Sequence, residues 1–279
     1  MIKILWILFF LVNVTLVKAN DNSASLQQVI SGKQRSSEHK ARDKYRHPQQ
    51  TLEFFEVKEN MTVVEIWPGE GWYTEILAPF LRNKGKLYAG HFSPDSKQSY
   101  YKKGVENFVK KLHKQPRVFD KVDLTVLQPT DLMAIAPAES ADRVLTFRNV
   151  HNWMKNDQAY LVFKAMYNAL KPGGILGVVE HRNNSLKSQD NKSESGYLSE
   201  DYVIALARNA GFEFLGKSEI NSNSKDTKDY SGGVWTLPPT LVLGDKNRNK
   251  YLAIGESDRM TIKFIKPNKS LFTGNNLSH

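Results

Sequence analysis

Two polar clusters follow apolar segments of the chain, and both carry side chains that can move a proton. The first is Arg148-Asn149-Val150-His151-Asn152, directly after the apolar run 142–147, and the second is Glu180-His181, at the end of the run 175–180. The ordinary pKa of histidine lies near ~6.5, so His151 is the first candidate for a general base, with Glu180 and His181 as the second candidates. The alternative for His151 is a structural imidazole bonded to a backbone carbonyl.

Arg148 adds a group that could bind a carboxylate through two parallel hydrogen bonds. Its alternative role is a salt bridge to Glu65 or Glu180. In open α/β sheets, ligands bind outside the carboxyl ends of the strands. Because both polar clusters follow apolar runs with strand composition, we expect them to face a pocket at that edge.

A glycine turn earlier in the chain offers a seat for a nucleotide-like ligand. Residues 61–66 form a short apolar run, Pro68-Gly69-Glu70-Gly71 follows, and residues 73–81 have helical spacing of apolar side chains. Glycines at such a turn let the backbone approach a ligand, and the helix beyond presents free N–H groups. The alternative is a tight turn that needs glycine for geometry alone. Glu65, inside the apolar run, is costly to bury unless it has partners.

The segment Glu65-Ile-Trp-Pro-Gly69-Glu-Gly71 resembles the first motif of class I S-adenosylmethionine-dependent methyltransferases, an acid followed by a Gly-x-Gly turn. More narrowly, the chain resembles a group of bacterial predicted methyltransferases that carry export signals and whose substrate is not established. The matching pieces are spread over most of the mature chain: Arg46-His-Pro, Trp67-Pro-Gly-Glu-Gly-Trp-Tyr-Thr-Glu-Ile-Leu-Ala-Pro, Thr146-Phe-Arg-Asn-Val-His-Asn-Trp, Lys171-Pro-Gly-Gly, Gly233-Val-Trp-Thr-Leu-Pro-Pro and Gly255-Glu-Ser-Asp-Arg-Met-Thr.

The resemblance implies a Rossmann-like α/β methyltransferase fold, with a mostly parallel seven-stranded sheet and helices on both faces. It also implies S-adenosyl-L-methionine as the cofactor, and places Arg42, Asp43, Arg46 and His47 near it, with a surface helix as the alternative. Asp131 is expected near the adenine amine, or as the cap of the next turn. The residues assigned to cofactor binding are Glu65, Trp67, Gly69, Gly71, Tyr73, Thr74, Asp131, Arg148 and Asn149.

One position departs from the methyltransferase pattern, which ends the second strand with an acid that binds the ribose hydroxyls. Here the expected second strand, 86–91, ends in Gly90-His91-Phe92, and Asp95 lies four residues beyond His91. Either His91 or Asp95 replaces the acid, or the ribose is held differently.

The chain divides into four parts. Lys3, the apolar run 4–12 and the ending Val17-Lys18-Ala19 predict a signal peptide, 1–19, that is cleaved after Ala19, with a retained membrane anchor as the alternative. Residues 20–50 are a polar extension that begins as a mobile leader and has a helix near 37–46. The methyltransferase-like domain spans 51–266, and 267–279 form a tail. Further strands are expected at 121–127, 142–147, 175–180 and 212–220, with a final β segment at 251–254 and 260–265, and helices at 97–114, 157–170 and 199–209.

Composition limits the classes of function. The chain has 279 residues, a net charge of +10 and no cysteine, which excludes thiolate zinc sites and cysteine nucleophiles. No motif of a metalloprotease, serine hydrolase or Walker-type nucleotidase is present, and we expect no metal. The basic residues are dispersed over 33–46, 102–114 and 246–250, and no nucleic-acid module is visible, so we expect no nucleic-acid partner.

The sequence therefore predicts an S-adenosylmethionine-dependent methyltransferase that acts on an unidentified, small-molecule acceptor. The alternative is an exported, non-catalytic or repurposed descendant of this fold that binds another ligand. The signal peptide predicts a periplasmic or secreted protein with no transmembrane segment after cleavage, away from the cytoplasm where the cofactor is made. The oligomeric state is not predicted.

Overall fold

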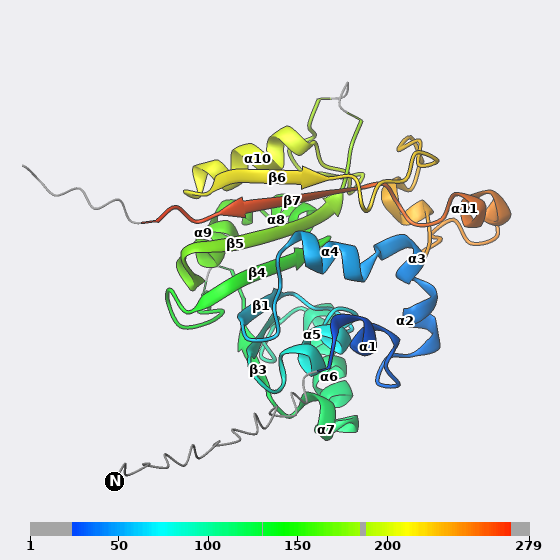
Figure 1. Ribbon diagram of the computed structural model, residues 1–279. Coiled ribbons are helices and arrows are strands. Elements are labelled where there is room, and N and C mark those ends of the chain that lie inside the picture. The colour runs from blue at the N-terminus through cyan, green and yellow to red at the C-terminus, as the bar shows by residue number, and fades with distance from the viewer. Residues whose placement is uncertain (1–23, 130, 185–187, 269–279) are drawn as a thin grey trace, which may run out of the picture.

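The described residues, 24–129, 131–184 and 188–268, contain a seven-stranded sheet in this computed structural model (Figure 1). Along the sheet the strand order is β3-β2-β1-β4-β5-β7-β6. Neighbouring strands among the first five run parallel, whereas β7 is antiparallel to both β5 and β6. The predicted α/β class with a mostly parallel sheet is confirmed. The strands are β1 (Thr62–Ile66), β2 (Lys86–His91), β3 (Val122–Val126), β4 (Ala141–Phe147), β5 (Leu170–His181), β6 (Glu213–Ser218) and β7 (Arg259–Ile265).

Helices cover both faces of the sheet because successive strand residues point to opposite sides and both sides are apolar. Val63 packs on one face with α1 (Leu26–Ser31), α4 (Pro48–Phe54), α5 (Thr74–Leu81) and α7 (Pro116–Phe119). Val64 packs on the other face with α8 (Val150–Lys155), α9 (Ala159–Ala169) and α10 (Glu200–Asn209). The other helical elements are α2 (Ser37–Ala41), α3 (Asp43–Arg46), α6 (Ser99–Lys114), α11 (Arg248–Ile254) and the 3-10 turn η1 (Gly233–Thr236).

Distant parts of the chain gather at the edge where β1, β4 and β5 end. In Figure 1 the N-terminal helices α2 and α3 and the C-terminal α11 lie on the side towards which these strands point. The switch in strand order between β1 and β4 lies at the same edge. Such a switch point is where open α/β sheets bind ligands.

The N-terminal region is more ordered than predicted. The sequence predicts a mobile leader at the start of 20–50, but from Ala24 onward the structure is packed on the domain. The helix α1 is capped at Ser25, whose hydroxyl accepts the N–H of Gln28, and it buries Val29. The expected helix near 37–46 is two short helices, α2 and α3, separated at Arg42. The predicted signal peptide and residues 269–279 of the tail lie outside the described residues.

Two further segments differ from the prediction. Residues 251–254, expected as β structure, belong to the helix α11, and only 259–265 form a strand. No helix was predicted between 148 and 156, where the polar cluster after β4 runs into the helix α8. Both helices are only six or seven residues long, a length at which strand and helix patterns are hard to distinguish.

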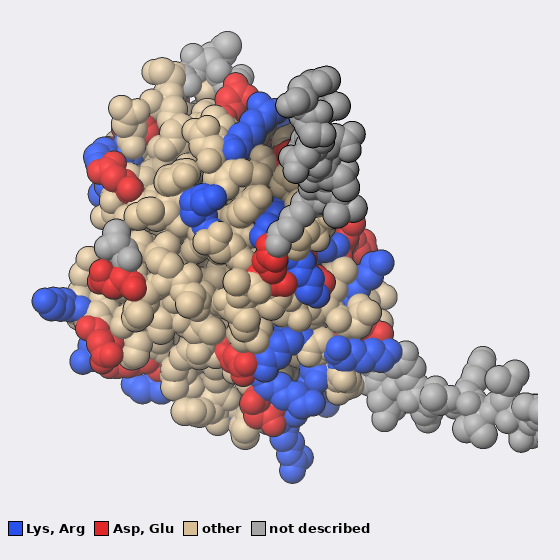
Figure 2. Space-filling view, turned by 90° about the vertical axis from the view of Figure 1, so that its left-hand side faces the viewer, with Lys and Arg blue, Asp and Glu red and all other residues tan. Residues whose placement is uncertain are grey.

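Charges on the face at the amino ends of the strands are mixed. Figure 2 views the molecule from this side, and lysines and arginines there lie among aspartates and glutamates. This distribution fits dispersed solvated charges. Among the described residues, no helix has the length and apolar character needed to cross a membrane.

Candidate active site

A cavity of about 510 Å³ lies at the carboxyl ends of β1, β4 and β5. Its walls come from five parts of the chain that are far apart in sequence, so it is built only by the folded domain. They are the N-terminal residues 39–46, the turn 67–73, the start of α8 at 147–152, the cover 234–240 and the segment 256–259, with Glu65, Tyr100 and His181 between them.

A histidine and a carboxylate form the chemical centre of this cavity. His151, in the first turn of α8, lines it, and Glu180, near the end of β5, lies fully buried behind His151. The Nδ1 atom of His151 is 3.0 Å from Oε1 of Glu180, which fixes the ring. The Glu180 carboxylate also accepts the backbone N–H groups of Val150 (2.7 Å) and His181 (2.8 Å). With Nδ1 bonded to the carboxylate, Nε2 is left as the atom that can take a proton.

His181 stands beside this pair. Its ring centroid is 5.4 Å from that of His151, and its Nδ1 lies 2.6 Å from the hydroxyl of Ser257. Burial, then the neighbouring His151 and arginine side chains, lowers the pKa of His181 well below its ordinary value. His181 is therefore neutral at pH 7 and suited to hydrogen bonding rather than to carrying charge.

The ligand atoms of His151, Glu180 and His181 lie within 4.8 Å of one another, a spacing that a metal ion could bridge. The sequence predicts no metal. Two observations disfavour a cation here: the Glu180 oxygens already accept backbone N–H bonds, and arginines lie close enough to lower the pKa of His181. Positive surroundings favour an anion instead.

Four arginines line the cavity, and three of them pair with a single carboxylate, that of Glu256. Nε of Arg42 lies 2.5 Å from Glu256, Nε of Arg46 lies 3.3 Å from it, and Arg259 also pairs with it. Burial alone would raise the pKa of Glu256, but the three arginines outweigh that effect and hold it below its ordinary value. The fourth, Arg148, has no carboxylate partner among the described residues.

Arg148 remains charged at neutral pH even though burial, then Arg259, lowers its pKa to about 10. Its backbone has a φ of 63°, a left-handed conformation that is uncommon for a non-glycine residue. The Nε of Arg259 is buried and has no hydrogen-bond partner among the described residues. Unpaired buried donors are rare in folded proteins, and Arg259 is a residue of the cavity wall.

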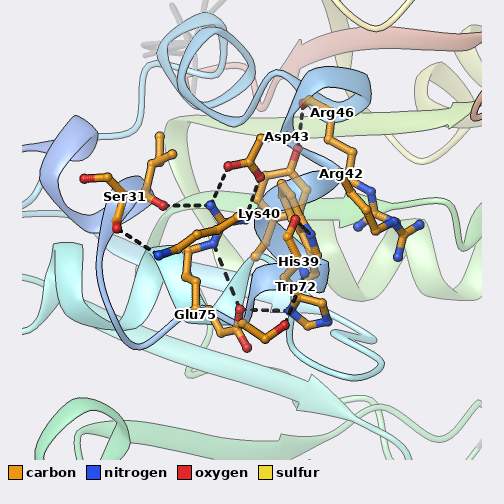
Figure 3. A network of polar contacts seen from close by, with 12 residues as sticks. Ser31, His39, Lys40, Arg42, Asp43, Arg46, Trp72 and Glu75 are labelled. Atoms are coloured by element: carbon orange, nitrogen blue, oxygen red, sulfur yellow. Dashed lines mark hydrogen bonds and ion pairs between the residues drawn. The ribbon is translucent and has the colours of Figure 1, made fainter.

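The helices α2 and α3, which carry Arg42 and Arg46, are held against the domain by polar contacts, as Figure 3 shows. Arg35 donates two hydrogen bonds of 2.7 Å to Asp43, and Nδ1 of His39 is 2.8 Å from Glu75 on α5. The ring of Trp72 lies under the guanidinium groups of Arg35 and Arg46, at 4.8 and 4.7 Å. This network explains how residues far from the sheet in sequence reach its carboxyl edge. Of the four N-terminal residues suggested by resemblance, Arg42 and Arg46 line the cavity, whereas Asp43 pairs with Arg35, and His47 does not line it.

Most residues predicted for cofactor binding line the cavity: Glu65, Trp67, Gly69, Tyr73, Arg148 and Asn149. Gly69 has a φ of 59°, and a Cβ there would meet no atom within 4 Å, so the backbone is open to a ligand. The amide of Asn149 donates to the carbonyl of Ile66 (2.9 Å) and ties the start of α8 to β1. Tyr73 stacks on Phe147 at a centroid distance of 3.6 Å.

Four predicted residues do not line the cavity. A Cβ on Gly71 would meet Phe108 at 3.0 Å, and its φ is 77°, so glycine is needed for the turn and not for a ligand. Thr74 donates a 2.6 Å hydrogen bond to Glu65, and Glu180 acts through His151. Asp131 is exposed on the loop after β3.

No site role was predicted for His39, Tyr100, Glu256, Ser257 or Arg259, which also line the cavity. Trp235 lines it too; the sequence offered this residue as a wall of the site or as core packing. A signal was present for some of these residues. The matching pieces Gly233-Val-Trp-Thr-Leu-Pro-Pro and Gly255-Glu-Ser-Asp-Arg contain Trp235, Glu256 and Arg259. Motifs that match a family without an evident structural reason are candidates for a site, and both segments meet at the cavity.

The pKa of Glu65 predicts a pH dependence of stability. Burial raises this pKa to about 7, from an ordinary value of 4.5. Glu65 therefore keeps its proton to a higher pH in the native state than in the unfolded chain. As the pH rises from 5 to 8, the free energy of unfolding should fall by about 2–3 kcal/mol. We expect Glu65→Gln to remove that decline, measured by urea unfolding between pH 5 and pH 8. The exposed Glu213→Gln is the control and should keep it; an unchanged slope in Glu65→Gln would show that another group is responsible.

Comparisons with known proteins bear on the fold. No protein-family model matches the sequence, and no curated protein matches it. The solved structure of the [4+2]-cyclase SpnF aligns with a TM-score of 0.58 and 16% identity over 86% of each chain. An S-adenosylmethionine-dependent methyltransferase from Aquifex aeolicus aligns with a TM-score of 0.54 and 17% identity, over 81% of this chain and 93% of that one. The chain has the fold of S-adenosylmethionine-dependent methyltransferases. At these identities the likeness shows the fold, and function has to come from the site.

The site fits the amino-acid end of S-adenosylmethionine but not its nucleoside end. The open Gly69 turn and the unpaired guanidinium of Arg148 could receive an amino-acid carboxylate. At the end of β2, however, Nδ1 of His91 accepts the N–H of Phe92 (2.7 Å), which leaves Nε2 to donate to the carbonyl of Gly69 (3.2 Å). His91 is fully buried and has no free acceptor for ribose hydroxyls, and the exposed Asp95 does not line the cavity. The cofactor as a whole does not fit these residues.

Proposed function

We propose that the cavity binds a small, multiply negative molecule and that His151 removes a proton from it. The observation that carries this proposal is the excess of guanidinium groups facing the His151–Glu180 pair. Arg42, Arg46 and Arg259 share one carboxylate, and Arg148 has none among the described residues. Arginine suits this task because its planar fork matches carboxylate and phosphate groups.

Each group has a role in this proposal. The guanidinium of Arg148 holds the acidic group of the ligand at the cavity wall, and the positive charge of Arg259 attracts it. Nε2 of His151 accepts the proton, and the imidazolium that forms is stabilised by Glu180 at 3.0 Å. Glu180 is a positioning residue: its bonds to Val150 and His181 keep the carboxylate in place.

Methyl transfer from S-adenosylmethionine to a small-molecule acceptor is the second candidate, and the fold likeness favours it. The role of His151 as the base would be the same for that candidate, but the residues at the end of β2 do not fit the nucleoside of the cofactor. We also propose, from residues 1–19, that the mature protein is periplasmic or secreted and acts on a small molecule rather than on a nucleic acid. That location separates it from the cytoplasm where the cofactor is made.

Anion binding tests the first candidate without knowledge of the reaction. We expect inorganic phosphate and tricarboxylates to bind the mature protein in calorimetry, and Arg148→Gln to weaken that binding about 10- to 100-fold, because a charged hydrogen bond is worth about 1.5–3 kcal/mol. Arg208→Gln, an exposed change on α10, is the matched control and should leave the affinity unchanged. Equal losses in both variants, or no binding of any polyanion, would refute the proposal.

A further inference from the structure

Trp67 has an unusual position at the end of β1. Its backbone has a φ of 44°, in the left-handed region that bulky residues rarely adopt. Trp67 is 7% exposed, so it lies almost wholly inside the protein although it is one of the residues that line the cavity. A strained conformation of this kind persists only where surrounding structure holds it, and such residues cluster at functional sites.

The indole ring reaches across the carboxyl ends of the neighbouring strands. Starting from β1, it passes the end of β2 and donates its Nε1–H to the carbonyl of Leu127, the residue after β3, at 3.1 Å. The ring packs against Phe92, which follows β2, at a centroid distance of 4.7 Å, and against Tyr101 at 5.9 Å. Trp153 of α8 contacts it from a third direction at 5.5 Å.

These contacts have the chemistry of a nucleobase site. A flat aromatic ring lies among aromatic side chains, and an N–H at its edge is bonded to a backbone carbonyl. An adenine placed over the ends of β2 and β3 would need the same contacts: stacking on its faces and an acceptor for its amine. Here the ring that makes them belongs to the protein.

The ribose position is closed in the same way. Both nitrogens of His91 are used by backbone groups, one of them the carbonyl of Gly69 in the turn after Trp67. Gly90 is also covered, since a Cβ there would meet Ile135 at 3.3 Å. Neither Phe92 nor Leu127 lines the cavity.

We propose that the side chain of Trp67 occupies the space over the ends of β2 and β3 in which this fold would bind a nucleoside, here called the nucleoside seat. The chemistry in the cavity therefore proceeds without an adenosyl cofactor. This inference is independent of anion binding, because the Trp67 ring contacts Leu127, Phe92, Tyr101 and Trp153, whereas the arginines gather around Glu256. It also gives Trp67 a role different from the predicted one: the residue takes the place of the cofactor instead of contacting it.

Opening the seat tests the proposal. In calorimetry we expect the natural mature chain to show no binding of S-adenosylhomocysteine or adenosine up to ~1 mM, and Trp67→Gly to bind both at least ~10-fold more tightly. Glycine suits the positive φ, so the turn should keep its shape. Trp235→Gly removes the same kind of ring from the cover segment of the cavity and is the matched control; it should gain no binding. A natural chain that binds S-adenosylhomocysteine below ~100 μM would overturn the proposal.

A second measurement, of melting temperature, keeps the test valid if Trp67→Gly destabilises the protein. The gap left by Trp67→Gly should accept free indole or adenosine, so both should raise the melting temperature of that variant by several degrees and leave the natural chain unchanged. Inorganic phosphate, by contrast, should raise the melting temperature of both proteins if the arginines bind anions. If neither indole nor adenosine changes the melting temperature of Trp67→Gly more than that of Trp235→Gly, the ring does not fill a nucleoside seat and the proposal fails.

Discussion

Replacing Glu256 with alanine is expected to lower the free energy of unfolding by about 3–5 kcal/mol, the usual effect of removing one partner from a buried ion pair. Glu256 is 3% exposed and is the shared partner of Arg42, Arg46 and Arg259. Without it, these guanidinium groups would repel one another and Arg148 in a confined space. Urea unfolding of the natural and variant proteins at pH 7 measures the loss.

Glu219→Ala provides a matched control, since Glu219 also pairs with an arginine, Arg182, but its side chain is 61% exposed. We expect that change to cost at most about 1 kcal/mol. Phosphate should restore part of the stability of Glu256→Ala, because a bound anion replaces the missing carboxylate. A Glu256→Ala protein as stable as the Glu219→Ala protein would mean that the arginines are not held by this carboxylate.

His151→Ala is expected to lower turnover by about 10²-fold or more with little change in melting temperature, because general-base catalysis contributes about 10²- to 10⁴-fold. Turnover must first be found. Exchange of a carbon-bound proton of an acidic ligand for deuterium detects the first candidate reaction, and release of S-adenosylhomocysteine detects the second. His151→Gln should recover part of the rate only if the ring acts as a hydrogen-bond donor.

Two further variants distinguish a catalytic role of His151 from a structural one. His113→Ala, an exposed change on α6, should leave turnover intact. Glu180→Gln should lower turnover and shift its pH profile, because the carboxylate no longer stabilises the imidazolium. If His151→Ala unfolds the protein while the folded fraction keeps full specific activity, the histidine is structural.

Local patterns were sufficient for much of the fold. The second strand was predicted at 86–91 and is found at Lys86–His91, because a glycine turn precedes it and alternate apolar residues fill it. The helix predicted at 199–209 is found at Glu200–Asn209, and Ser199 caps it, since its hydroxyl accepts the N–H of Tyr202. In both cases the information lies within one short segment. The helix α11 shows the opposite case, since four residues, 251–254, cannot distinguish the two periods.

The site was predictable only in part. His151 and Arg148 were found because parallel strands deliver the residues that follow them to one edge. Arg42 and Arg46 were placed near the site by resemblance, but their meeting with Arg259 around Glu256 was not predicted. Arg42 and Glu256 are 214 residues apart, and nothing local indicates that they meet. The place of Trp67 was not predictable either. The resemblance assigned this residue to cofactor binding, but the direction of its side chain depends on a backbone φ of 44° and on its hydrogen bond to Leu127.

A crystal structure of the mature chain, soaked with both phosphate and S-adenosylhomocysteine, tests the central claim most directly. We expect density for phosphate beside Arg148 and Arg259, facing Nε2 of His151. We also expect the indole of Trp67 to remain bonded to the carbonyl of Leu127, with no adenosyl group over β2 and β3. Density for an adenosyl group at the ends of those strands, with Trp67 displaced, would contradict the account.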